Sequence, residues 1–320
     1  MDNTQNDNPS QDDSTQSLRN SIFAAQKAYE NRNVEQQPQQ QVAAPSFTGQ
    51  PQTSSGLGGG LHLEIPVDRI PLPSEGKCYP QAHPLHGHTS IEFRAMTTRE
   101  EDILTNQAYI KKGTVVNELV KSCLLDKSID VNSLLAGDRN ALMVAIRASG
   151  YTSRYSPTIA CPACEHKQDL EVDLSQLGIK NLQIQPVQTG SNMFEFVLPV
   201  CKYKVLFRFL TGQDEENLLA EQTAKKKRGI LASSLVTSRL LASIISIHGV
   251  SDRGQIARFI SEMSALDSLE LRQYIDKTEP GLDMSVQFDC SNCEHSEEVV
   301  LPIDASFFWP NSKRQRGVNS

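Results

Sequence analysis

Two stretches of the sequence share one pattern and decide the expected fold: FRAMTTREEDIL (93–104) and FRFLTGQDEENL (207–218). They match without gaps at Phe, Arg, Thr, Glu and Leu. In each, a stretch typical of a strand leads into a helix that opens with threonine and carries an acidic residue three positions later. This capping pattern also places negative charge at the positive end of the helix dipole. Its recurrence indicates an internal duplication.

The same order of features follows each stretch. Asp138 and Asp267 each begin a predicted amphipathic helix, and each lies 23 residues before a cysteine pair. The two pairs, CPACEH (161–166) and CSNCEH (290–295), stand between short alternating runs that favour strands. The second copy is 15 residues longer between the shared strand and the shared aspartate. Together, the matching strand, helix cap, aspartate spacing and cysteine pair are hard to obtain by chance.

The four paired cysteines form a candidate metal site. A C-x-x-C turn between two strands lets both sulfurs face one ion, and two such knuckles complete the tetrahedral thiolate shell that structural zinc prefers. We therefore expect one structural zinc per chain, bound by Cys161, Cys164, Cys290 and Cys293. The 125 residues between Cys164 and Cys290 are explained if each half donates one knuckle. A closed four-cysteine shell has no open coordination position, so this zinc would hold the halves together without catalysis.

Other readings of these residues stay open. His166 and His295 each follow a cysteine pair. Each could replace a thiolate as a ligand, or could orient a ligand without contacting the metal itself. The two cysteine pairs could also be unrelated buried or free thiols. Cys78, Cys123 and Cys201 are expected to be small core residues.

Composition limits the functional class. The 320 residues, 38% of them hydrophobic, suffice for one or two domains with a sizeable core. A mean hydropathy of -0.39 and the lack of an apolar stretch near 18 residues argue against a membrane-spanning helix. The acidic, polar residues 1–16 do not resemble a signal peptide, so we expect a reducing compartment. A net charge of -7 argues against general nucleic-acid binding and leaves only a local basic patch open. Seven cysteines favour metal or free thiols over disulfides.

The sequence predicts four regions. Residues 1–60, rich in Gln, Asn, Ser and Gly, are expected to form a disordered tail because they cannot bury enough apolar surface to offset ordering. Within this tail, SLRNSIFAAQKAYENR (17–32) has helical spacing and is interpreted either as a recognition helix for a partner or as a transient helix. The first repeat spans 61–190, the second repeat 191–310, and a basic tail 311–320.

No assembled active site is evident. The sequence lacks the phosphate-binding and dinucleotide-binding glycine motifs and the H-E-x-x-H metalloprotease motif. His83, His86 and His88 in HPLHGH could bind a metal, but a surface loop is the commoner explanation. The basic runs 225–228 and 313–316 could meet phosphates, although no aromatic platform accompanies them. The aromatic FFWP (307–310) is expected to pack on the repeat core.

The motifs also resemble a known family. LPSEGKCYP (72–80), FRAMTTREEDIL, the aspartate helix, the CPAC pair and the closing FFWP are similar to the T4-type bacteriophage baseplate protein family, over most of residues 61–310. The resemblance implies a non-enzymatic hub subunit or assembly factor of a contractile phage tail. Other baseplate and tail proteins would be its partners, in the virion tail baseplate or in the host cytoplasm during assembly. It supplies no catalytic residues.

Together these observations predict an α+β protein with a disordered N-terminal tail and an internally duplicated strand–helices–zinc-knuckle unit. The two halves would be joined by a zinc-ribbon-like site of four cysteines. The expected function is structural, through protein–protein binding. Two alternatives remain: a zinc-ribbon nucleic-acid-binding protein, and a metal-dependent hydrolase that uses the HPLHGH histidines.

Overall fold

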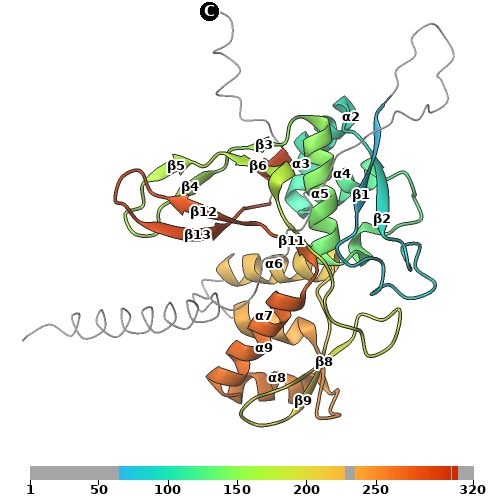
Figure 1. The fold of residues 1–320 in the computed structure, drawn as a ribbon, viewed down its shortest axis with the longest axis vertical. Coiled ribbons are helices and arrows are strands. Elements are labelled where there is room, and N and C mark those ends of the chain that lie inside the picture. Colours follow the sequence, from blue (N-terminus) through green and yellow to red (C-terminus); the bar gives the residue numbers. More distant parts are fainter. Residues whose placement is uncertain (1–64, 228–234, 304, 309–320) are drawn as a thin grey trace, which may run out of the picture. The chain divides into compact units, whose positions relative to one another are not determined.

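The computed structural model describes residues 65–227, 235–303 and 305–308. The predicted tails 1–60 and 311–320, and Trp309, lie outside these ranges. Within them, the chain combines helices with small antiparallel sheets, as the predicted α+β class requires (Figure 1). In the described parts of the chain, no helix is long and apolar enough to cross a membrane.

The region up to residue 190 begins with a hairpin, β1 (Val67–Pro71) and β2 (Ser90–Arg94). Ile91 and Phe93 of β2 are buried and alternate with exposed or half-exposed residues, which is the period-2 pattern of a half-buried strand. The helices that follow are α2 (Thr98–Thr105), α3 (Gln107–Lys112), α4 (Val115–Cys123), η1 (Val131–Ser133) and α5 (Ala136–Gly150). Short elements complete the region: β3 (Arg154–Tyr155), β4 (Thr158–Ala160), β5 (Lys167–Asp169), β6 (Val172–Asp173), η2 (Leu174–Gln176) and β7 (Ile179–Lys180).

The region from residue 191 repeats much of this order. Its sheet has the strand order β10-β9-β8, formed by β8 (Phe194–Val197), β9 (Lys204–Phe207) and β10 (Ile244–Ile247). Its helices are α6 (Gly212–Lys227), α7 (Leu235–Ser243), α8 (Arg253–Glu262) and α9 (Ala265–Thr278). The chain continues through β11 (Gly281–Leu282), β12 (Ser285–Asp289), β13 (Ser296–Val300) and η3 (Ala305–Phe308). β11 pairs with β7 of the first region.

The two shared sequence stretches form the same local structure. At the start of α2, Thr97 and Glu100 form the predicted capping box, and Arg94 donates two hydrogen bonds to the Glu100 carboxylate, at 2.6 and 3.0 Å. The backbone N–H of Thr97 donates to the same carboxylate at 2.8 Å. Glu100 therefore caps α2 and binds Arg94 at the same time.

The equivalent contacts recur at the start of α6. Arg208 donates to both oxygens of Asp214, at 2.6 and 2.7 Å, and the Thr211 N–H donates to Asp214 at 2.8 Å. Each threonine hydroxyl also donates to its acid, at 2.7 Å in the first region and 2.8 Å in the second. The sequence match thus extends to individual hydrogen bonds.

A second matching contact involves the two aspartates. Asp138 is 1% exposed in the first turn of α5 and accepts a hydrogen bond from the Ser74 N–H at 3.0 Å. Asp267 is 1% exposed in the first turn of α9 and accepts from the Val200 N–H at 2.7 Å. Both donors follow a Leu-Pro pair at the end of the first strand of a hairpin. The Tyr79 hydroxyl also donates to Asp138, at 2.7 Å.

One apolar core runs through both regions. It contains buried side chains from β1 to η3, among them Phe93, Leu142, Phe207 and Leu271. Phe307 and Phe308 are fully buried in this core, which confirms the expected packing for these two aromatic residues. Backbone hydrogen bonds also join the two regions. For example, the Gly212 N–H donates to the Leu134 carbonyl oxygen at 2.9 Å.

The Glu100 carboxylate predicts how stability depends on acid. Burial alone would raise the pKa of Glu100, but hydrogen bonds from Arg94, Ser122 and Thr97 outweigh it and lower the pKa to about 2. A carboxyl group whose folded pKa is lowered stabilises the fold above its unfolded pKa, near 4.3, and loses that contribution as pH falls toward the folded pKa. We expect up to about 3 kcal/mol of unfolding free energy to be lost between about pH 5 and pH 2 from this group.

Urea unfolding across this pH range measures the effect. The Glu100→Gln variant should have a flatter dependence on pH, whereas Glu262→Gln, at an exposed position on α8, should behave as the unchanged chain. Identical slopes for Glu100→Gln and the unchanged chain would contradict the assignment.

Candidate metal centre

Each cysteine pair lies on a turn that joins two antiparallel strands. Cys161 and Cys164 connect β4 to β5, and Cys290 and Cys293 connect β12 to β13. In each turn the N–H of the first cysteine donates to the carbonyl oxygen of the histidine five residues later, at 2.8 Å. The residue after each second cysteine, Glu165 or Glu294, has a positive φ, of 58° and 56°. The predicted strand–turn–strand knuckle is therefore present twice, with the same closure.

The structure brings all four cysteines together. The Sγ atoms of Cys161 and Cys293 lie 3.7 Å apart, as do those of Cys164 and Cys290, and all four sulfurs lie within 4.8 Å of one another. A tetrahedron with metal–sulfur bonds of about 2.3 Å has edges of about 3.8 Å. A disulfide would need about 2.05 Å, and all four are free cysteines. The arrangement can therefore hold a tetrahedral ion such as zinc.

The knuckles rest on a small apolar cluster apart from the main core. Its buried members are Cys161, Cys290 and Phe288, with Ile159 and Val299 packed against them. Cys161 is 1% exposed and Cys290 7%, whereas Cys164 is half-buried and Cys293 is exposed. So few apolar side chains supply little stability by themselves, which is the condition under which small domains depend on a bound metal.

Hydrogen bonds make the thiols electrostatically unequal. The backbone N–H of His166, then the side chains of Asn292 and Cys293, favour the Cys164 thiolate and lower its pKa to about 6. At Cys293 the backbone N–H of His295 favours the thiolate, but hydrogen bonds to Cys164 and the other thiols outweigh it and raise the pKa to about 12. A thiolate on Cys164 is thus stabilised by its protonated neighbour. A cation at the centre would favour the thiolate form of all four.

Two residues that the sequence did not single out join the knuckles. The Gln168 side chain donates to the Asp289 carbonyl oxygen at 2.8 Å and accepts from the Ser291 N–H at 2.8 Å. Asn292 donates to the Cys164 sulfur at 3.6 Å. β4, β5, β12 and β13 consequently lie side by side (Figure 1). Only the glutamine's position two residues after the histidine could have signalled this role.

The three remaining cysteines take no part in the cluster. Cys78 and Cys123 are buried, and burial raises the pKa of each thiol to about 12, with smaller contributions from nearby charges. Such thiols stay protonated and are poor metal ligands. Cys201 is half-buried against the core. The expectation that these are core residues fits this packing.

Residues 68–309 match the model of a protein family that is described as T4 bacteriophage base plate protein. The chain belongs to this family. No curated protein and no solved structure matches the chain. The match covers both knuckles, both capped helices and both buried aspartates. It places the chain among baseplate proteins of phage tails.

Two histidines of the HPLHGH stretch make hydrogen bonds within this baseplate protein, outside the cysteine cluster. His83 Nε2 lies 2.9 Å from the Ser133 hydroxyl, and His86 Nδ1 lies 2.7 Å from the Tyr79 carbonyl oxygen. Among the described residues, the only group of three or more potential metal ligands is the four-cysteine cluster. Hydrogen bonds of His83 and His86 therefore hold the loop against Ser133 and Tyr79.

Replacing His83, His86 and His88 together with alanine should leave the zinc content unchanged. The reason is that none of the three side chains belongs to the cysteine cluster. Elemental analysis of the purified full chain provides the measurement, with Cys161→Ser as the variant that should lose zinc. A loss of zinc from the triple histidine variant would support the hydrolase alternative instead.

Proposed function

We propose that the chain is a structural or assembly protein of the baseplate hub in a contractile phage tail, and that it acts by binding other proteins. The match of residues 68–309 to the baseplate family carries this proposal. The family and the cysteine shell both favour a protein without enzymatic activity. The partners would be other baseplate and tail proteins, and the location would be the virion tail baseplate, or the host cytoplasm during assembly.

Within this function, one structural zinc per chain is bound by Cys161, Cys164, Cys290 and Cys293. The sulfur separations of 3.7 Å and the thiol-only donor set support this assignment. With all four positions of a tetrahedral zinc ion filled by protein, none remains for a substrate or an activated water. The ion would fix the relative position of two chain segments that are far apart in sequence.

The two halves, 61–190 and 191–310, are homologous repeats in this proposal. The matching Arg–acid caps, the matching contacts of Asp138 and Asp267, and the matching knuckles support it. The strand register agrees as well. Phe93 pairs with Asp68, four residues before Leu72, and Phe207 pairs with Phe194, four residues before Leu198. Each half contributes one hairpin, one capped helix and one zinc knuckle.

Quantitative mass spectrometry tests the role in the phage. Peptides from residues 93–310 would be counted in purified particles and in the lysate of infected cells. A fixed copy number per particle identifies a hub subunit, and abundance in lysate with absence from particles identifies an assembly factor. Deleting the gene should abolish complete tails in either case. Complete, infectious tails without the protein would contradict the proposal.

A further inference from the structure

A groove of about 340 Å³ lies between strand β2 and the residues that follow α4. Its apolar lining includes Leu85, Ile91, Leu125 and Ile129, and Ser90 of β2 lines it as well. Leu125 is 41% exposed. The groove therefore places an apolar surface beside one edge of the β1–β2 hairpin.

That edge of β2 is open. The Leu72 N–H donates to the Thr89 carbonyl oxygen at 2.8 Å, so in this antiparallel register Ser90 and Glu92 direct their backbone groups away from β1. The Glu92 carbonyl oxygen accepts from the Leu125 N–H at 3.5 Å. Among the described residues, none bonds to the backbone N–H or carbonyl oxygen of Ser90. An unpaired strand edge of this kind can template a further strand.

The corresponding edge in the second half is occupied, a comparison that rests on the duplication proposed above. There β9 takes the place of β2, and β10 pairs along it. The His248 N–H donates at 2.7 Å to the carbonyl oxygen of Lys204, the residue that corresponds to Ser90. Ile247 of β10 lies opposite Val205 and is 5% exposed in the core. A strand with a buried apolar side chain thus fills the position that is open in the first half.

The first half lacks this third strand because its chain turns after Leu125. The Asp126 carboxylate accepts from the Ser128 N–H at 2.9 Å and from the Ser128 hydroxyl at 2.6 Å, which is the pattern of an Asx turn. The Lys127 Nζ donates to two carbonyl oxygens near the end of α4, at 2.9 and 3.0 Å. The chain then continues into η1 instead of along β2.

We propose that an extended segment of another phage tail protein pairs with this edge of β2 as a third strand. The proposal rests on the protein-binding role in the baseplate proposed above. The added strand would bond to the free backbone groups of Ser90 and place one apolar side chain against Ile91 and Ile129, as β10 places Ile247 in the second half. Main-chain hydrogen bonds would supply affinity, and the groove would select the side chain.

The charges of the groove define this segment further. Arg69 and Glu92 line the groove and form an ion pair with each other. Asp126 accepts hydrogen bonds from Ser128, which lower its pKa and keep it negative. With histidine counted as neutral, His88 adds no charge, so the lining has the net negative charge of Asp126. We therefore expect the segment to carry lysine or arginine where it passes Asp126.

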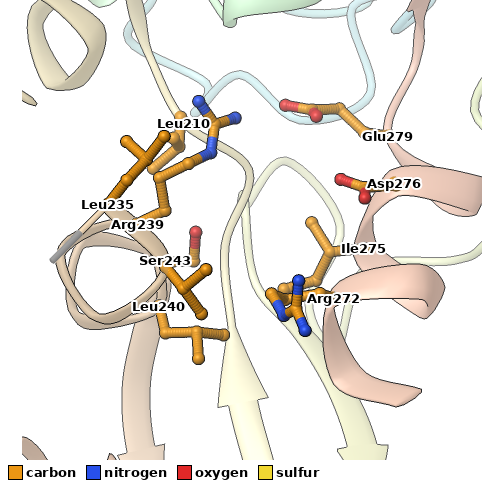
Figure 2. Close-up of a pocket in the computed structure, with 10 residues that line it drawn as sticks. Leu210, Leu235, Arg239, Leu240, Ser243, Arg272, Ile275, Asp276 and Glu279 are labelled. Atoms are coloured by element: carbon orange, nitrogen blue, oxygen red, sulfur yellow. The ribbon is translucent and has the colours of Figure 1, made fainter. Parts of the chain in front are cut away.

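A second cavity does not define a partner in this way. It measures about 190 Å³ and opens between α7 and α9 (Figure 2). Figure 2 shows Arg239 across the cavity from the carboxylates of Asp276 and Glu279, and Arg272 lines it too. Two bases thus match two acids within this cavity, which leaves no net charge to attract a ligand.

Photo-crosslinking during phage assembly tests the strand pairing. The photoreactive amino acid p-benzoylphenylalanine would replace Leu125, the exposed apolar residue of the groove, in the full-length chain made in infected cells. After irradiation, mass spectrometry would locate the adducts. We expect them on one segment of another phage tail protein.

Proline variants show whether the contact uses the strand edge. Ser90→Pro removes the free N–H and should lower the crosslinking yield about tenfold, the upper end of the usual value of one hydrogen bond. Proline is tolerated at the first residue of a strand, so the hairpin should persist. Ser90→Ala keeps the N–H and should keep the yield. Glu195→Pro, at the outer edge of β8, is the matched proline control and should also keep it.

A charge variant gives a second readout that does not depend on a proline. Asp126→Lys should lower the yield about fivefold, whereas Glu262→Lys on α8 should not. Zinc content and the urea midpoint of unfolding would show that each variant is folded.

Several results would overturn the proposal. Adducts between two copies, or within one chain, would give the groove a different occupant. An absence of adducts, or a yield unchanged in both Ser90→Pro and Asp126→Lys, would exclude the added strand. Any of these results in phage that still form complete tails would leave the baseplate role intact, whereas complete tails without the gene would contradict that role itself.

Discussion

Replacing Cys161 or Cys290 with serine is expected to remove bound zinc and to lower the free energy of unfolding by about 4 kcal/mol. Both side chains are buried, at 1% and 7% exposure, and each belongs to a different knuckle. A metal that joins them closes a loop of more than 100 residues, for which the chain-entropy model of a crosslink gives about 4–5 kcal/mol. The small apolar cluster around Phe288 cannot replace that contribution.

Elemental analysis and urea unfolding of the full chain, purified without a histidine tag, measure both effects. Cys201→Ser is the matched control, because Cys201 is a free cysteine outside the cluster. It should retain zinc and most of its stability. We call the zinc ion bound by the four cysteines the zinc clamp. It would be contradicted if Cys161→Ser kept one zinc per chain and unfolded at the same urea concentration as the control.

Replacing Glu100 with alanine is expected to cost about 3–5 kcal/mol of unfolding free energy. The Glu100 side chain is fully buried and its partner Arg94 is 17% exposed, so the substitution leaves a largely buried guanidinium without its carboxylate. Breaking a buried ion pair in this way costs more than the pair itself contributes. Ser122 and the Thr97 N–H would lose the same acceptor.

The second copy of the motif provides the control for this prediction. Asp214 and Arg208 are more exposed, at 16% and 30%, so Asp214→Ala should cost less, about 1–3 kcal/mol. The double variant Arg94→Ala/Glu100→Ala should be less destabilised than the sum of the single variants. Denaturant unfolding measures all of these. Equal, small losses for Glu100→Ala and Asp214→Ala would show that burial of the first pair does not matter.

Much of the local structure could be predicted because short sequence motifs encode it. Neighbouring residues determine several of its features: the strand before Thr97, the capping box, the helix that carries Asp138 and the turn at each cysteine pair. The strand register and the helix caps of the two stretches resemble each other, and the proposal of a repeat rests on that resemblance. The four sulfurs could be proposed to come together because two C-x-x-C turns supply the four thiolates of a structural zinc site.

Other features could not be predicted because they join residues that are distant in the chain. Gln168 reaches a backbone group 121 residues away, and Gly212 bonds to Leu134. No local pattern specifies such contacts. The same holds for the pocket beside Arg239, because its charged residues lie on two helices whose packing is set by tertiary contacts. The histidines of HPLHGH were ambiguous for the same reason, since Ser133 is 50 residues from His83.

X-ray absorption spectroscopy at the zinc edge, on the full-length protein purified without a histidine tag, tests the zinc clamp most directly. The account predicts one zinc per chain with four sulfur neighbours at about 2.3 Å and no nitrogen or oxygen in the first shell. A mixed sulfur and nitrogen shell would bring His166 or His295 into the site. A chain that binds no zinc when the metal is supplied in excess would contradict the clamp itself.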